Sequence, residues 1–131
     1  MNGVRVSLIA LMCLVVVLFV AVGCRSATAT PLPSGIRDGD YAIAHYKLRF
    51  QGDRFTMLTE YDQEVAVGSF VVSGDRVTFT EVKSPVECKS QDPVYSYQWS
   101  FNGKALTFSN ANDKCLSRIM LMTENPWVLK G

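Results

Sequence analysis

The sequence predicts an all-β protein, a small antiparallel up-and-down meander closed into a barrel or packed as a sandwich. Three observations lead to this fold class. Apolar and polar residues alternate along several short segments after residue 40, and short turns rich in Gly, Asn and Asp separate these segments. No helical pattern of 12 residues follows residue 24. Short strands at regular spacing with tight turns are typical of antiparallel barrels and sandwiches.

The clearest element is a hairpin over residues 95–108. In its first strand the aromatic side chains share one face, and they alternate with Ser, Gln and Asn: the aromatics are Tyr95, Tyr97, Trp99 and Phe101. Asn102-Gly103 predicts a two-residue type I′ turn, since both positions favour positive φ. Leu106 and Phe108 continue the apolar face on the returning strand.

Two strands are expected before residue 60. Residues 42–50 read as one strand with Ala42, Ala44, Tyr46, Leu48 and Phe50 on one face, and His45, Lys47 and Arg49 on the other. Gln51-Gly52-Asp53 turns the chain into a second strand, whose inward residues are Phe55, Met57 and Thr59.

Two more strands follow between residues 61 and 80. Residues 61–64 form a turn, and residues 65–72 are apolar on both faces, which predicts a strand covered on both sides or a bulge near Gly68. Ser73-Gly74-Asp75 is another tight turn. Val77 and Phe79 then point inward on a fourth strand.

The remaining chain is less regular. Residues 84–93 are expected to form a loop containing Cys88, and residues 109–114 a second loop. Residues 115–118 fit a single helical turn and residues 119–122 a last short apolar strand. Pro126-Trp127 is expected to close the chain against the body, for six or seven strands in all.

The N-terminal segment indicates export. An apolar stretch from Val6 to Val22, interrupted by Ser7, ends in Gly23-Cys24 and is followed by a Ser-, Thr- and Pro-rich stretch. This arrangement resembles the lipobox of bacterial lipoproteins. The resemblance implies that 1–23 is a lipoprotein signal helix that is removed, that Cys24 is lipidated with palmitate or a similar acyl chain, and that the protein is anchored on the extracytoplasmic face of the cell membrane. An ordinary cleaved signal peptide and an uncleaved membrane anchor remain alternatives.

We therefore expect three segments: the signal 1–23, a flexible tether 24–39 and a folded domain 40–131. The prolines of the tether favour extended polyproline II backbone. Thirteen basic and twelve acidic residues give the chain a net charge of +1. Because Arg5 lies in the signal, the exported part is close to neutral. Without a run of Lys or Arg, no nucleic-acid partner is expected.

Of the four cysteines, Cys13 lies in the signal and Cys24 is the lipidation candidate. Cys88 and Cys115 remain, and in an oxidising compartment they are expected to form a disulfide. A metal site or a reactive thiol is the competing interpretation. Two cysteines without a neighbouring histidine make a poor zinc site.

Several motifs together resemble lipocalin-like (calycin-type) bacterial exported proteins. They are Gly52-Asp53-Arg54-Phe55, residues 68–72 with 74–79, Tyr97-Gln98-Trp99-Ser100, residues 113–118 and Pro126-Trp127. The resemblance spans about residues 40–128 and implies a lipocalin-like barrel with a central apolar ligand site. With roughly 90 residues the barrel is narrow, so its own aromatic side chains are an alternative filling.

Enzymatic motifs are absent from the sequence, and no catalytic residue, cofactor or metal is expected. His45, the only histidine, is expected on the surface. Glu60, Asp62 and Glu64 form either a solvated acidic turn or a weak calcium site. Arg118 is expected to pair with a carboxylate or carbonyl group, or to bind the acid group of a ligand at the barrel mouth.

Two function classes remain. In the first, the domain binds a small apolar ligand, and the candidate lining is Tyr46, Phe55, Phe79, Tyr97, Trp99 and Phe108, together with Arg118. The competing interpretation is that these aromatics only build the core. In the second, the domain is a cell-envelope interaction or inhibitor protein that acts on a partner protein through its surface loops, as small barrel lipoproteins that inhibit lysozyme do.

Overall fold

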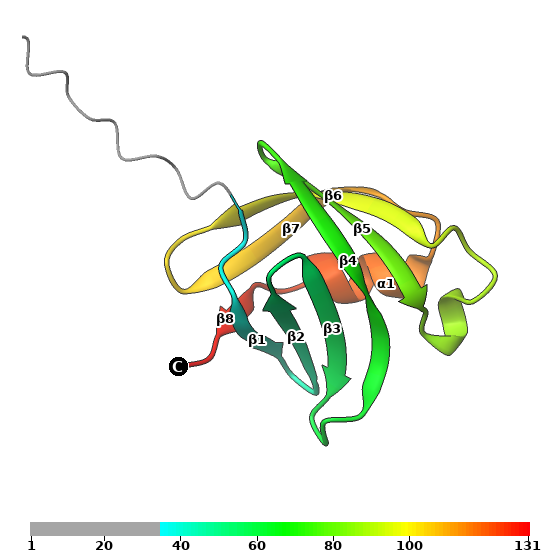
Figure 1. Cartoon of the computed structure of the whole chain (residues 1–131), viewed down its shortest axis with the longest axis horizontal. Coiled ribbons are helices and arrows are strands. Elements are labelled where there is room, and N and C mark those ends of the chain that lie inside the picture. The colour runs from blue at the N-terminus through cyan, green and yellow to red at the C-terminus, as the bar shows by residue number, and fades with distance from the viewer. Residues whose placement is uncertain (1–34) are drawn as a thin grey trace, which may run out of the picture. The chain divides into compact units, whose positions relative to one another are not determined.

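The computed structural model describes residues 35–131 and contains one closed antiparallel barrel (Figure 1). Neighbouring strands along the chain pair in sequence order, and the last strand pairs with the first. The eight strands are β1 (Gly39–Ile43), β2 (Tyr46–Gln51), β3 (Arg54–Thr59), β4 (Glu64–Ser73), β5 (Arg76–Lys83), β6 (Val94–Phe101), β7 (Ala105–Asn112) and β8 (Trp127–Leu129). The predicted up-and-down barrel is confirmed, with eight strands in place of six or seven.

The additional strand comes from residues 42–50, where the prediction of one continuous strand is wrong. The chain turns at Ala44, which has a φ of 33°, and β1 folds back on β2 with Tyr41 opposite Leu48. Tyr41 is fully buried, so it takes an inward position that the single-strand interpretation did not assign. No Gly, Asn or Pro marks this turn. It is held by the pairing of β1 with β8 as well as with β2.

The predicted turns before β3 and β5 are confirmed. Gly52 and Gly74 occupy the left-handed region with φ of 62° and 61°. The register of β4 against β5 shifts between Val67 and Gly68, at the position where a bulge is expected, but the extra residue is Val82 on β5 and not a residue of β4. A Cβ atom at Gly68 would lie 2.0 Å from the carbonyl oxygen of Thr80, so the close approach of β5 requires glycine there.

The hairpin of β6 and β7 is confirmed, with Phe101 opposite Leu106. Its turn is not type I′, however, because that turn needs positive φ at both positions. Gly103 has positive φ and Asn102 does not. The side-chain oxygen of Asn102 instead accepts hydrogen bonds from the backbone N–H groups of Lys104 and Ala105. The loop predicted over 109–114 is also wrong in its first part, because β7 continues to Asn112.

The apolar run at residues 119–122 is helical, and the strand predicted there is wrong. The helix α1 (Leu116–Thr123) buries Arg118 and Met122, which lie four residues apart on one face. A short apolar run fits a strand and a helix equally well by its pattern alone. The last strand is β8, and Trp127 at its start is fully buried, as expected for the residue that closes the chain.

Packed side chains fill the barrel interior. Phe79 is at the centre, with ring centroids of six aromatic residues 5.0–6.4 Å away: Phe50, Phe55, Phe70, Tyr95, Tyr97 and Phe108. Three of these pairs, those with Phe55, Tyr97 and Phe108, meet edge to face, a favourable arrangement for aromatic rings. Ile36, which the sequence analysis assigned to the tether, is also buried in this core.

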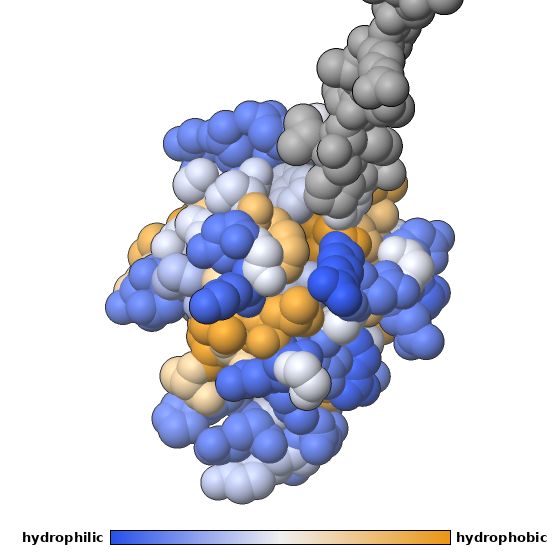
Figure 2. All heavy atoms as spheres, turned by 90° about the vertical axis from the view of Figure 1, so that its left-hand side faces the viewer, coloured by the Kyte–Doolittle hydropathy of each residue, from blue (hydrophilic) through white to orange (hydrophobic). Residues whose placement is uncertain are grey.

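The core reaches the surface on the side where β1, β8 and the β6–β7 turn lie in Figure 1. Figure 2 faces this side and shows a hydrophobic band in its middle, surrounded by hydrophilic residues. Partly buried apolar residues of these elements, Phe101 and Leu129 among them, pack against the core. Within residues 35–131, no helix has the length and apolar character that crossing a bilayer requires.

Candidate functional site

A pocket of about 650 Å³ lies at one end of the barrel. Its walls come from the start of β2, the end of β3, the start of β4, the end of β5, the loop 84–89 with the short 3₁₀ helix η1 (Val86–Cys88), and one face of α1. The apolar lining consists of Tyr46, Met57, Val65, Pro85, Val86 and Leu121. The polar lining includes Glu64, Lys83, Glu87, Lys89, Arg118 and Glu124.

The position of the pocket follows from the inward-facing rows of the strands. On β5, Val77, Phe79 and Glu81 are buried, and Lys83, next in the same row, lines the pocket. The row thus changes from apolar to charged where the barrel ends. Ser117, Leu121 and Glu124, spaced three and four residues apart on and just after α1, form the facing wall.

The aromatic residues proposed as a ligand lining lie mostly elsewhere. Phe55, Phe79, Tyr97 and Phe108 are buried in the filled interior, each no more than 1% exposed. Trp99 is only partly buried, and its indole N–H donates to the carbonyl oxygen of Gly74 in the turn between β4 and β5, at the strand ends away from the pocket. Of the six proposed aromatics, Tyr46 alone borders the pocket, and Arg118 borders it too.

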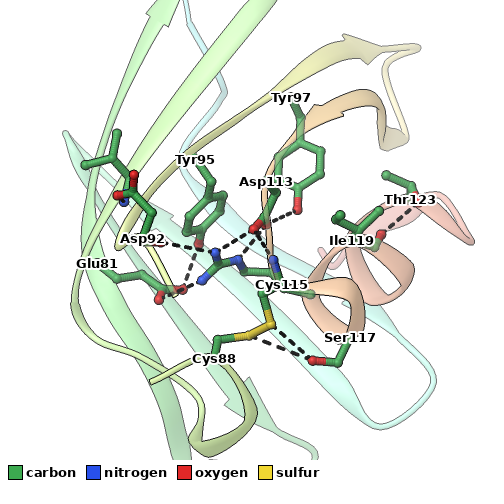
Figure 3. A network of polar contacts seen from close by, with 12 residues as sticks. Glu81, Cys88, Asp92, Tyr95, Tyr97, Asp113, Cys115, Ser117, Ile119 and Thr123 are labelled. Atoms are coloured by element: carbon green, nitrogen blue, oxygen red, sulfur yellow. Dashed lines mark hydrogen bonds and ion pairs between the residues drawn. A yellow bond between two sulfur atoms is a disulfide. The ribbon is translucent and has the colours of Figure 1, made fainter. Parts of the chain in front are cut away.

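Arg118 is the centre of a buried polar network, whose members Glu81, Tyr95, Tyr97 and Asp113 are labelled in Figure 3. Its Nε and Nη2 donate to the two carboxylate oxygens of Asp113 at 2.6 and 2.7 Å, and its Nη1 donates to Glu81 at 3.0 Å. Nη2 also donates to the carbonyl oxygen of Asp92, and the guanidinium lies 3.6 Å from the ring centroid of Tyr95. The expectation that Arg118 pairs with a carboxylate is confirmed.

Two tyrosines complete this network. Tyr95 donates its hydroxyl to Glu81 at 2.8 Å, and Tyr97 donates to Asp113 at 2.6 Å. Burial and the adjacent carboxylates raise the pKa of both hydroxyls well above the ordinary value. Both tyrosines therefore stay neutral donors to the carboxylates across the physiological range.

Asp113 is held ionised by its neighbours. Burial acts to raise the pKa of its carboxyl, but hydrogen bonds from Arg118, Tyr97 and the backbone N–H of Cys115 outweigh burial, and the pKa lies below its usual value. The side chains of Glu81 and Asp113 are fully buried and that of Arg118 is 2% exposed. The network therefore places two acidic side chains, Glu81 and Asp113, around the one guanidinium group of Arg118.

Cys88 and Cys115 form a disulfide, as expected, with their Cα atoms 5.6 Å apart. The bond connects η1 to the residue immediately before α1, and Cys88 and Ser117 both line the pocket. Ser117 Oγ lies 3.2 Å from the sulfur of Cys115. The disulfide therefore joins the two walls of the pocket that are not strands.

The acidic residues of the turn after β3 each contact a basic side chain. Glu60 pairs with His45 at 3.0 Å, Asp62 pairs with Lys47, and Glu64 pairs with Lys83 at 3.4 Å. His45 is exposed, as expected. No group of three potential metal-ligating side chains occurs within the part of the chain that the structure describes.

Several residues of this site were not predicted from the sequence. Glu81 was not singled out, although the alternation of Val77 and Phe79 places it in the same inward row. Val65, Lys83 and Leu121 were not assigned to a site because the end of the barrel to which they belong depends on the turns and on α1. The lipidation candidate Cys24 lies outside the described residues.

Comparisons with known proteins add no further assignment. No protein-family model, no curated protein and no solved structure matches this chain. The fold and the pocket therefore have to carry the functional argument.

Proposed function

We propose that this chain is an exported, lipid-anchored protein whose lipocalin-like barrel binds a small apolar ligand in the pocket beside α1. The observation that carries the proposal is the contrast between the two parts of the barrel. The interior is filled by aromatic rings, whereas the end beside α1 holds about 650 Å³ with an apolar lining of Tyr46, Met57, Val65 and Leu121. This volume falls in the range of small-molecule sites.

Burial of apolar surface would drive binding. Each Å² of apolar ligand surface removed from water contributes about 25 cal/mol before the costs of association. The disulfide and the Arg118 network hold the walls in place without ligand, so little ordering remains to be done on binding.

The test of the pocket is a thermal-unfolding titration of the purified domain with decanol, a short isoprenoid alcohol and an aromatic probe. A ligand at one hundred times its Kd stabilises by about 2.7 kcal/mol, which raises the Tm of a small domain on the order of 10 °C. Trp99 fluorescence is unsuitable as the readout, because Trp99 lies at the turn between β4 and β5.

Matched variants on β4 locate the binding. Val65→Trp fills the pocket and is expected to abolish the ligand-induced rise in Tm, whereas Val71→Trp, at an exposed position of the same strand, should leave it unchanged. If none of the probes shifts the Tm, or if Val65→Trp binds them like the original chain, the ligand-binding proposal is wrong.

The anchor is tested separately at Cys24. Cys24→Ala is expected to abolish incorporation of labelled palmitate and to release the domain from membranes or leave the signal uncut. The motivation is Gly23-Cys24 at the end of the apolar stretch. Membrane binding and processing unchanged by Cys24→Ala would contradict the anchor while leaving the pocket untouched.

A second candidate function is inhibition of an envelope protein or enzyme through surface loops. Exposed apolar side chains favour it: Val86 in η1 and Leu116 at the start of α1 are 77% and 70% exposed, on either side of the disulfide. A lysozyme-inhibition assay tests this candidate. Inhibition that Val86→Asp and Leu116→Asp both weaken would favour it over ligand binding.

A further inference from the structure

The charge around the pocket indicates which apolar ligands it accepts, given the proposed function above. Arg118 borders the pocket and would be the obvious anchor for an anionic head group. All three of its guanidinium nitrogens, however, already donate to Asp113, Glu81 or the carbonyl oxygen of Asp92. These bonds use four of its five N–H groups, so a ligand carboxylate could accept only the second N–H of Nη1, and a two-point contact with a fatty acid would displace a buried bond.

The network behind Arg118 holds two acidic side chains at this end of the barrel. Glu81 and Asp113 are both fully buried and both accept hydrogen bonds from Arg118, so a ligand carboxylate that approached Arg118 would also approach these two acidic side chains.

The rim of the pocket has more unpaired acidic than unpaired basic side chains. Lys83 is bound by Glu64 through the carbonyl oxygen at 2.8 Å and the carboxylate at 3.4 Å. Apart from Arg118, the other charged lining residues are two acids, Glu87 and Glu124, and one base, Lys89. None of these three has an ion-pair partner within residues 35–131. The rim therefore offers two unpaired carboxylates against one unpaired ammonium group.

From these charges we infer that the pocket binds cationic amphiphiles, molecules with an apolar chain or ring and a positively charged nitrogen, in preference to fatty acids of the same size. The apolar part contacts Met57, Val65 and Leu121, and the charged nitrogen lies at the rim near Glu87 and Glu124. The partly buried ring of Tyr46 in the lining adds a face that attracts cations.

The experiment compares three decyl compounds that differ only in the head group: decyltrimethylammonium, decanol and decanoate, each below its micelle-forming concentration. Calorimetry and Tm shifts on the folded, disulfide-bonded domain are expected to rank the ammonium compound first and decanoate last. One exposed ion pair contributes roughly 0.2–1 kcal/mol, so the ammonium compound should bind about 1.4-fold to fivefold tighter than decanol for each pair that it forms. The preference should decrease as salt is added.

Charge-neutral variants locate the preference. Glu87→Gln combined with Glu124→Gln is expected to remove most of the advantage of decyltrimethylammonium over decanol without changing decanol binding. Asp53→Asn, in the turn between β2 and β3 at the other end of the barrel, removes the same kind of charge and should keep the advantage. The control separates a local effect at the rim from an effect of net charge.

The outcomes distinguish this inference from the proposal on which it rests. Equal binding of the three compounds, tighter binding of decanoate, or a preference unaffected by the double variant would overturn the inference and leave an apolar-ligand site in place. Failure of all three compounds to bind would overturn both.

Discussion

At the scale of single residues, Gly68 shows how closely two strands approach each other. The register shift between β4 and β5 brings the carbonyl group of Thr80 against the Cα of Gly68, and the ring of Phe55 lies on the same side. The backbone of Gly68 is not in the left-handed region, so lack of space, and not φ, is the reason for glycine.

We predict that Gly68→Ala destabilises the domain by at least about 2 kcal/mol, because the added methyl group would lie 2.0 Å from a backbone atom that cannot rotate away. Urea unfolding measures the change. Gly35→Ala is the control: a Cβ there meets nothing within 4 Å, and its effect should stay within about 0.5 kcal/mol. Similar midpoints for both variants would contradict this explanation of Gly68.

Arg118 is a buried cation that pairs with two buried acidic side chains. Removing it leaves Glu81 and Asp113 buried without a cation. We expect Arg118→Met to cost about 3–5 kcal/mol, since an uncompensated buried charge is expensive. Arg49→Met, which breaks the exposed pair with Asp40, should cost no more than about 1 kcal/mol.

Arg118→Met is also expected to change how stability depends on pH. The folded-state pKa of Asp113 lies below its usual value, so its stabilising contribution is present above the unfolded pKa and is lost as the pH falls through the folded pKa. Without Arg118 the folded-state pKa of Asp113 should rise, so this contribution disappears, and the cost of Arg118→Met should be largest near neutral pH and shrink as the pH falls through the folded-state pKa of Asp113. Urea unfolding of both proteins at several pH values between 7 and the acid range measures this, and a cost that does not change with pH would contradict the role given to Asp113.

At the scale of elements, α1 decides which residues face the core. In a strand over 119–122, Met120 and Met122 would share a face. In the helix, Met122 shares a face with Arg118 and is 1% exposed, whereas Met120 is 55% exposed. Helical periodicity also turns Leu121 toward the pocket, so the pocket depends on this element being a helix.

We predict that Met122→Ala lowers the free energy of unfolding by about 2–5 kcal/mol, while Met120→Ala changes it by less than about 0.5 kcal/mol. Denaturant unfolding of the two variants side by side is the measurement. Equal costs at the two positions are what a strand would give, and they would speak against the helix.

At the scale of the whole molecule, the chain closes on itself twice. β8 pairs with both β1 and β7 to close the barrel, and the Cys88–Cys115 bond joins segments 27 residues apart. Both closures act around α1, which comes between β7 and β8. The disulfide therefore restrains η1 and α1, which both border the pocket.

We expect the Cys88→Ser, Cys115→Ser double variant to lose about 3–4 kcal/mol of stability, because the unfolded chain regains the freedom of a long loop. The variant should also weaken ligand binding at temperatures where it is still folded, since loop 84–89 and α1 are no longer joined. Thermal unfolding and a decanol titration measure the two effects. A fully retained affinity would indicate that the disulfide stabilises the fold without shaping the pocket.

Features that depend on residues close together in the chain could be predicted from the sequence alone. Alternation places Phe55, Phe79, Tyr97 and Phe108 on inner faces, and glycine at positions 52 and 74 sets two turns, because side-chain direction and φ are local properties. The disulfide followed from counting, since Cys88 and Cys115 are the two cysteines that remain after Cys24, the lipidation candidate.

Only the tertiary structure decided the number of strands, the helix α1 and the pocket. The turn at Ala44 has no local signal and depends on the pairing of β1 with β8, which is distant in the chain. Glu81 and Arg118 are buried because closure of the barrel brings β5 and α1 together. The filled interior and the open end have the same cause. A narrow barrel has little internal volume, and the aromatic rings around Phe79 occupy it. The remaining space therefore lies beside α1, where the inward-facing rows of side chains end.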